Sequence, residues 1–149
     1  MHIEVVVDAS VWVSSFRPED VNHNASRFWA EQYNIKGELL VAPMLLLIEV
    51  AASISRRTGQ TIQAQEAVKR LHSISKIQIA PVDSALVQSA VEVAINLQLR
   101  AGDAIYVALA HQLSIPLVSW DKEQLQRSES LISTYTPDNY TFQEIHEEE

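Results

Sequence analysis

Short apolar segments rich in β-branched residues alternate with longer segments of helical spacing along this chain, and this alternation limits the possible folds strongly. Strands are expected at residues 3–7, 39–42, 76–80 and 115–119, with a fifth, weaker strand near 131–132. Parallel strands need a crossover between them, usually a helix. The pattern therefore predicts an α/β fold with three layers, α/β/α, around a central, mainly parallel sheet of four to five strands.

Segments in which apolar side chains recur with the helical period fill the intervals between the expected strands. Helices are expected near residues 25–33, 44–57, 64–71, 86–97 and 104–113. The helix at 44–57 is apolar nearly all round, which predicts that it is buried. Pro43 suits the first turn of that helix. Ala101-Gly102 is expected to interrupt the helical pattern after residues 86–97, so that a new helix begins at Asp103.

The length and composition indicate one globular domain. The chain has 149 residues, of which 47% are hydrophobic and 20% charged, and this excludes disordered, collagen-like and repeat proteins. We expect the domain to span residues 1–135. Residues 136–149, which end in consecutive glutamates, are expected to form a loose tail.

Charge, cysteine content and hydropathy exclude several kinds of site. Eleven basic against nineteen acidic residues give a net charge of −8, which disfavours broad electrostatic binding to nucleic acid or anionic lipid. The absence of cysteine excludes disulfides, thiolate metal sites and cysteine nucleophiles. The longest apolar run, residues 39–48, is far shorter than the roughly 20 residues of a membrane span, and no signal-peptide pattern is seen. We therefore expect a cytoplasmic protein that makes no membrane contact.

Four carboxylates stand where a parallel sheet of this kind binds ligands. Asp8 directly follows the first expected strand, and Asp121 follows the fourth. Asp103 opens the helix that leads into the fourth strand, and Glu49 lies within the apolar helix that follows the second. Ligands bind beyond the carboxyl ends of the strands in open parallel sheets. These four side chains are therefore expected to meet at one edge of the sheet.

Each of these acids also has a purely structural interpretation. Asp8 and Asp121 suit turns or helix N-caps, and Asp103 suits the first turn of a helix, where the helix dipole favours an acid. Glu49 can extend its carboxylate toward solvent, or pair with Arg56 or Arg57 one or two turns away. The four positions are not independent, however, because the expected topology brings them to the same edge.

Four carboxylates in one cleft require a cation. At about 4 Å and an effective dielectric constant near 20, each pair repels by on the order of 4 kcal/mol. Oxygen ligands, without cysteine or suitably spaced histidine, select Mg²⁺ or Mn²⁺ over zinc. An ion held by few carboxylates and several water molecules typically serves phosphate chemistry.

Other sites that act on phosphates lack their motifs in this chain. The glycines at 37, 59 and 102 form no dinucleotide-binding or P-loop pattern, and no Gly-x-Ser-x-Gly nucleophile elbow is present. A phosphotransfer receiver domain needs an acidic pair near the first strand and a lysine after the fifth, and a haloacid-dehalogenase-type phosphatase needs an aspartate in place of Ser10. A binding or scaffold subunit of the same fold stays open as an alternative.

Four segments resemble, in order and spacing, the PIN-domain ribonucleases, and among them the small toxins of VapBC-type toxin–antitoxin pairs. The segments are residues 5–11 (Val-Val-Val-Asp-Ala-Ser-Val), 47–50 (Leu-Ile-Glu-Val), 100–110 (Arg-Ala-Gly-Asp-Ala-Ile-Tyr-Val-Ala-Leu-Ala) and 116–121 (Pro-Leu-Val-Ser-Trp-Asp). Each alone is a weak signal, whereas four in order are a strong one. The resemblance runs from Ile3 to about Leu125 and implies a PIN-like fold.

This resemblance implies an endoribonuclease that depends on Mg²⁺ or Mn²⁺ and uses an acidic quartet of Asp8, Glu49, Asp103 and Asp121. Asp8, Asp103 and Asp121 are the implied metal ligands, for one ion or two. Glu49 is expected to bind the ion through water or to orient the attacking water.

Ser10 and Ser119 fall where the family often carries a hydroxyl that supports the site. Two positions depart from the family pattern. Trp120 is bulkier than the small residue expected before the fourth acid and is predicted to narrow the cleft, and Gly102 loosens the start of the helix before the third acid. Neither change removes a carboxylate.

The partners implied by the resemblance are an RNA substrate, a second copy in a homodimer, and a small antitoxin with a segment that blocks the cleft. With a net charge of −8, RNA must be held by the metal and a local basic rim. The candidates for that rim are Arg17, Arg56, Arg57, Arg100 and Lys122. An RNA-processing nuclease outside any toxin–antitoxin pair remains an alternative, which an adjacent antitoxin reading frame would exclude.

Overall fold

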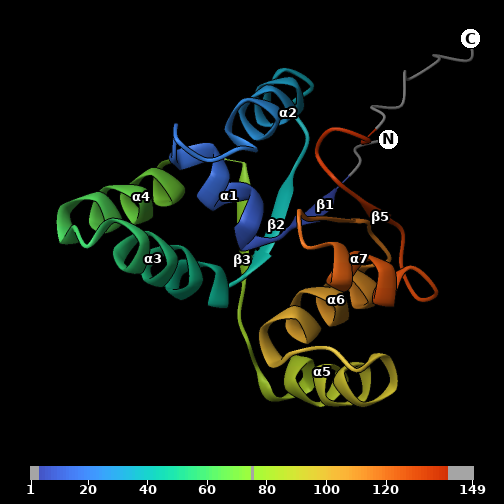
Figure 1. Cartoon of the computed structure of the whole chain (residues 1–149). Coiled ribbons are helices and arrows are strands. Elements are labelled where there is room, and N and C mark those ends of the chain that lie inside the picture. Colours follow the sequence, from blue (N-terminus) through green and yellow to red (C-terminus); the bar gives the residue numbers. More distant parts are fainter. Residues whose placement is uncertain (1–3, 75, 141–149) are drawn as a thin grey trace, which may run out of the picture.

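The computed structural model describes residues 4–74 and 76–140, which form a parallel sheet between two layers of helices (Figure 1). The strands are β1 (Val5–Val7), β2 (Leu40–Pro43), β3 (Ile77–Ala80), β4 (Leu117–Val118) and β5 (Thr134–Tyr135). The helices are α1 (Ala9–Phe16), α2 (His23–Ile35), α3 (Leu45–Thr58), α4 (Thr61–Ser73), α5 (Ser84–Leu97), α6 (Ala101–Leu113) and α7 (Lys122–Ser128). The predicted three-layer α/β/α architecture is confirmed.

The strand order β3-β2-β1-β4-β5 makes β1 the central strand of the sheet. It pairs with β2 through Val5 and Leu40 and with β4 through Val6 and Leu117, in parallel on both sides. From β1 the chain moves outward through β2 and β3, and then returns to the other side of β1 for β4 and β5. The carboxyl ends of β1 and β4 therefore lie side by side at the point where the strand order reverses.

An apolar core on each face of the sheet holds the three layers together. Along β1, Val5 and Val7 face one core and Val6 faces the other, as the alternation of a strand requires. The core beside α1–α4 includes Trp12, Trp29, Tyr33, Leu46 and Leu71. The core beside α5–α7 includes Leu86, Tyr106, Leu109 and Leu125. Burial on both faces explains why the strands read as continuous apolar runs.

Two short helices, α1 and α7, were not predicted, and each begins directly after an aspartate. The Asp8 carboxylate accepts a hydrogen bond from the backbone of Ser10 at 2.9 Å, and the Asp121 carboxylate accepts one from the backbone of Gln124 at 3.1 Å. Both contacts satisfy amide groups that a helix start otherwise leaves unpaired. The segments are too short for a clear helical period, so no helix was predicted there, although a turn or an N-cap was expected at each aspartate.

Several predicted boundaries differ from the structure by a few residues, among them those at Pro43, the fifth strand and the start of α6. Pro43 ends β2 instead of opening α3, because the next amide, that of Met44, bonds to the carbonyl of Ala80 at 2.8 Å and continues the sheet pairing. The fifth strand lies at Thr134–Tyr135 and not near 131–132. Helix α6 begins at Ala101, because the preceding residue already has the extended backbone of an N-cap. The glycine that follows is thus part of the first turn.

The prediction that helix α3 is buried on all sides is wrong. Leu46, Val50 and Ile54 are buried in the core, but Met44 is 51% exposed and Ile48 is 67% exposed. Helix α3 lies in an outer layer, so only one stripe of its surface can pack against the sheet and its neighbours. Gly59 ends the helix in the left-handed conformation (φ 65°) that favours glycine.

The expected tail is described only as far as Tyr140. The Tyr140 ring packs edge-on against Trp29 and Tyr135, with ring centroids 5.8 Å and 5.3 Å apart. The expected extension of the first strand to Ile3 and the rest of the tail, residues 141–149, lie outside the described residues. Within the part of the chain that is described, no helix is both long and apolar enough to cross a membrane.

Leu46→Ala should destabilise the protein by about 2–5 kcal/mol, because it leaves a cavity where α3 meets the core. Ile48→Ala, on the exposed face of the same helix, is the matched control and should change stability by less than about 0.5 kcal/mol. Urea unfolding followed by circular dichroism measures both. Equal losses for the two variants would contradict the packing of α3.

Candidate functional site

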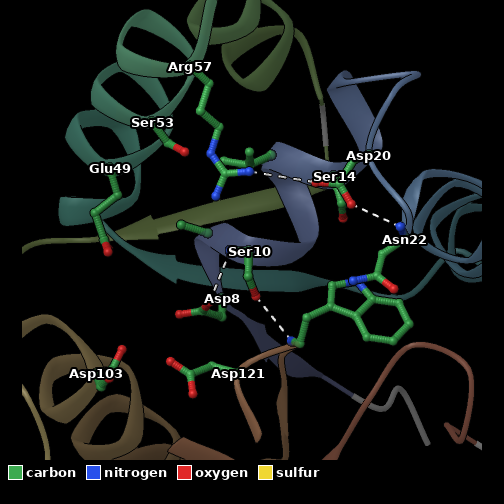
Figure 2. Close-up of a pocket in the computed structure, with 13 residues that line it drawn as sticks. Asp8, Ser10, Ser14, Asp20, Asn22, Glu49, Ser53, Arg57, Asp103 and Asp121 are labelled. Atoms are coloured by element: carbon green, nitrogen blue, oxygen red, sulfur yellow. Dashed lines mark hydrogen bonds and ion pairs between the residues drawn. The ribbon is translucent and has the colours of Figure 1, made fainter.

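A cleft of about 460 Å³ opens beyond the carboxyl ends of β1 and β4, and all four predicted acids line it (Figure 2). Asp8 follows β1, Asp121 follows β4, Glu49 comes from α3 and Asp103 from the first turn of α6. The structure thus brings together side chains from four separate elements at the switch point, as the topology predicts.

Asp8 and Asp121 are helix N-caps and cleft residues at the same time. Each uses one carboxylate oxygen to cap its helix, α1 or α7. The other oxygen of Asp8 lies 3.5 Å from the side-chain nitrogen of Gln124, which is fully buried. The capping contacts fix where both carboxylates stand. The two interpretations of these residues, structural and functional, are therefore compatible.

Ser10 and Ser119 join the segments that carry Asp8 and Asp121. Their hydroxyl oxygens lie 3.3 Å apart. The backbone amide of Trp120 donates to the Ser10 hydroxyl, and the amide of Asp121 donates to the Ser119 hydroxyl, both at 3.0 Å. The serines hold the chain after β4 against the start of α1, which positions the two acids relative to one another.

Trp120 forms one wall of the cleft. Its indole nitrogen donates to the Ser26 hydroxyl at 2.7 Å, and that hydroxyl lies 2.6 Å from the hydroxyl of buried Ser14. These contacts fix the large ring beside α1 and α2. Trp12, in contrast, is 5% exposed and packs in the core.

Glu49 makes no ion pair among the described residues, so the alternative of a pair with Arg56 or Arg57 is wrong. Arg57 instead faces Asp20, with a nitrogen–oxygen distance of 3.9 Å. The Glu49 carboxylate is half-buried, and its Oε1 atom is shielded from solvent without a hydrogen-bond partner in the described structure. A β-carbon on Gly102 would lie 3.5 Å from Oε2, so α6 begins directly against this carboxylate.

Burial and mutual repulsion raise the pKa of three of the acids. Burial raises the pKa of Asp8, while hydrogen bonds from Ser10 and Gln124 act in the opposite direction. Burial raises the pKa of Glu49 to about 7; the nearby Tyr106 hydroxyl acts in the opposite direction, and the charges of Asp8 and Asp103 add to the rise. Burial, followed by the charges of Asp8 and Asp121, raises the pKa of Asp103 to about 6. The surroundings in the cleft therefore disfavour the ionised form of these three carboxyl groups.

The chemistry of the cleft fits a hard divalent cation, although the carboxylates stand apart. No three acids or histidines of the described residues are close enough to hold one ion in this arrangement. The available donors are carboxylate and hydroxyl oxygens, with no histidine or cysteine lining the cleft. The Oε1 atom of Glu49 is buried without a hydrogen-bond partner in the described structure. Such oxygen donors match Mg²⁺ or Mn²⁺.

Of the five basic residues proposed for RNA contact, Arg57 lines the cleft. Arg100 is exposed at the start of α6 and lowers the pKa of Asp103 by its charge. Arg17 pairs with Glu19 at 2.9 Å, away from the carboxylates. The remaining two, Arg56 and Lys122, are exposed and do not line the cleft.

Several residues of the site were not predicted from the sequence. Gln124 supports Asp8, and its position three residues after Asp121 matches the Asp-x-x-Gln form of a capping box, which was available as a signal. Ser53 is four residues after Glu49 and therefore on the same helix face. Asp20 and Asn22 lie in the loop between α1 and α2, where no sequence signal pointed to the cleft.

Comparison with solved structures supports the fold. The chain is similar to the toxin VapC20 of Mycobacterium tuberculosis, which cleaves the sarcin–ricin loop, with a TM-score of 0.69 and 22% identity over 80% of this chain and 92% of that one. It is also similar to a chain of the DNA-bound VapBC2 complex of Rickettsia felis, with a TM-score of 0.69 and 14% identity over 89% of this chain and 98% of that one.

A chain of the DNA-bound VapBC complex of Salmonella typhimurium gives a TM-score of 0.67 and 10% identity over 91% of this chain and 98% of that one. At such identities the likeness is one of fold. No curated protein sequence matches the chain. The model of the PIN domain family, however, matches residues 5–129, which make up most of this chain. The chain belongs to the PIN domain family.

Proposed function

We propose that this PIN domain is an endoribonuclease that depends on Mg²⁺ or Mn²⁺ and hydrolyses RNA phosphodiester bonds. The observation that carries the proposal is the convergence of Asp8, Glu49, Asp103 and Asp121 in one cleft, where none of them has an ion-pair partner in the described structure. Retaining four such acids is costly for the fold alone. A bound divalent cation offsets that cost and gives the acids a common role.

In this proposal Asp8, Asp103 and Asp121 hold the metal. When bound, the ion lowers the pKa of the attacking water and stabilises negative charge on the phosphate and leaving oxygens. Glu49 orients that water and accepts its proton, since burial raises its pKa to about 7, close to neutrality. Ser10 and Ser119 keep Asp8 and Asp121 in register through the backbone contacts of Trp120 and Asp121.

The biological role that we propose is that of the toxin in a toxin–antitoxin pair, acting in the cytoplasm. The support is the fold likeness to VapC20, a sarcin–ricin loop cleaving toxin, and to chains of VapBC complexes. The partners are then RNA, a small antitoxin that covers the cleft, and a second copy in a homodimer. An RNA-processing nuclease without an antitoxin would share the same cleft, and the genomic neighbourhood separates the two roles.

Asp103→Asn should lower the rate of RNA cleavage by at least about 100-fold, because removing even an outer-shell contact of a metal site costs 10–100-fold and Asp103 is a proposed ligand. The assay is cleavage of end-labelled total RNA with Mn²⁺ or with EDTA. Glu66→Gln, an exposed acid on α4, is the matched control and should cleave normally. A folded wild-type protein that cuts no RNA in the presence of Mn²⁺ would favour the scaffold alternative.

The metal-free protein should be more stable at pH 5 than at pH 8. A carboxyl group with a raised folded-state pKa favours folding while protonated, and this contribution is lost as pH rises through the folded pKa values of about 7 for Glu49 and about 6 for Asp103. Thermal melts in EDTA measure the difference. Glu49→Gln should make the melting temperature depend less on pH. A higher melting temperature at pH 8 than at pH 5, in both the wild-type protein and the variant, would contradict the raised pKa values.

Mn²⁺ at about 100 times its Kd should restore roughly 2.7 kcal/mol of stability to the wild-type protein at pH 8, since it binds only the folded state. This corresponds to an increase in Tm of about 5–11 °C for a chain of this size. Asp103→Asn should reduce the metal response without lowering the stability of the metal-free protein. An unchanged melt across the metal titration would exclude the metal site.

A further inference from the structure

The cleft that holds the four acids has a second, cationic end on the same helix. Glu49, Ser53 and Arg57 follow one another at intervals of four residues along α3, and all three line the cleft (Figure 2). Eight residues of helix span about 12 Å. Arg57 is the only lysine or arginine among the described residues that line this cleft. One wall therefore runs from the carboxylates to a single positive charge.

Arg57 is held weakly in this structure. It faces Asp20 at 3.9 Å, which is longer than a hydrogen bond, and its side chain is 53% exposed. Asp20 is 15% exposed and is fixed in place, because its Oδ1 atom accepts from the backbone amide of Asn22 at 2.9 Å. The guanidinium is thus the movable partner of the pair. A pair of this length, with a half-exposed arginine, gives little stability, so another anion can replace Asp20.

A phosphate group is the anion that suits this position. The planar guanidinium matches phosphate oxygens with two parallel hydrogen bonds, which are stronger than a long contact with a carboxylate. Ser53, beside Arg57 on α3, and Asn22, next to Asp20, also line the cleft and provide further hydrogen-bond donors. A strand with its scissile phosphate at the carboxylates would place another phosphate near Arg57.

We propose that Arg57, with Ser53 and Asn22, forms a subsite for a second, non-scissile phosphate of the RNA strand, and that Asp20 occupies Arg57 until RNA displaces it. The inference rests on the proposed ribonuclease function and deepens it, because it assigns the path of the bound strand along α3. It also explains how a chain with a net charge of −8 holds a polyanion beside four acids.

The test measures binding and not cleavage. A fluorescein-labelled, random-sequence 12-nucleotide RNA is titrated by anisotropy with Ca²⁺ in place of Mg²⁺, at several salt concentrations, and the RNA is checked for integrity on a gel. Arg57→Ala should weaken binding roughly tenfold. It should also reduce the slope of log K against log salt by about 0.7, the value for one phosphate contact on a single strand. An unchanged slope would overturn the subsite.

Arg27→Ala is the matched control. Arg27 is also an exposed arginine, 59% exposed and paired with Glu31 at 3.4 Å, but it lies on α2 outside the cleft. This variant should keep the wild-type affinity and salt slope. If it loses as much as Arg57→Ala, the effect is one of overall charge and the subsite is wrong.

Asp20→Asn tests the displacement directly. Removing the competitor should strengthen RNA binding about twofold to fivefold, which corresponds to the usual worth of an exposed ion pair. In the Arg57→Ala background the same substitution should give a smaller gain, since no guanidinium remains to be released. Equal gains in both backgrounds would show that Asp20 acts only by its charge, and would overturn its role as competitor.

Failure of the subsite and failure of the nuclease proposal give different results. If the wild-type protein binds and cleaves RNA, and Arg57→Ala leaves the affinity and the salt slope unchanged, the subsite alone is wrong. A folded wild-type protein that neither binds nor cuts RNA overturns both.

Discussion

The adjacency of β1 and β4 is the constraint on which the site depends. Both strands end at the reversal of the strand order, so the residues that follow them meet outside the sheet. Asp8 and Asp121 occupy these places, and each also caps the helix that begins there. The same hydrogen bonds that start α1 and α7 therefore fix two carboxylates of the cleft. Position and helix formation are coupled in this fold, so replacing either aspartate with a residue that cannot cap a helix affects both.

The cleft gathers negative charge that the fold must hold without help from ion pairs. The raised pKa values of Asp8, Glu49 and Asp103 show that burial and repulsion act against ionisation. Neutral hydrogen bonds provide the rigidity that ion pairs would otherwise supply, because serine hydroxyls bind one another and the backbone after β4. Neutral groups hold the carboxylates without cancelling their charge. The charge thus stays available to a cation.

The sequence predicted the layers and the convergence of the acids because both follow from strong, local signals. Buried parallel strands read as apolar runs, and a carboxylate after such a run stands out. The helices α1 and α7 were missed because eight and seven residues are too few to show a period. The burial of α3 was overestimated because apolar composition does not show which side of a helix meets a neighbour. Asp20 and Asn22 were missed because loop geometry places them at the cleft.

The carboxylates at one end of the cleft are rigidly held, whereas Arg57 at the other end is not, and this difference suits the two ends to different roles. The carboxylates are fixed by caps, serines and burial, so they suit a centre that must keep a constant geometry during a reaction. Arg57 is long, half-exposed and loosely paired, so it suits a contact that forms when a strand arrives. Chemistry requires positions that are set in advance, whereas recognition of a flexible polymer tolerates adjustment. Helix α3 carries one group of each kind, Glu49 and Arg57, and it couples the two ends by its own stiffness.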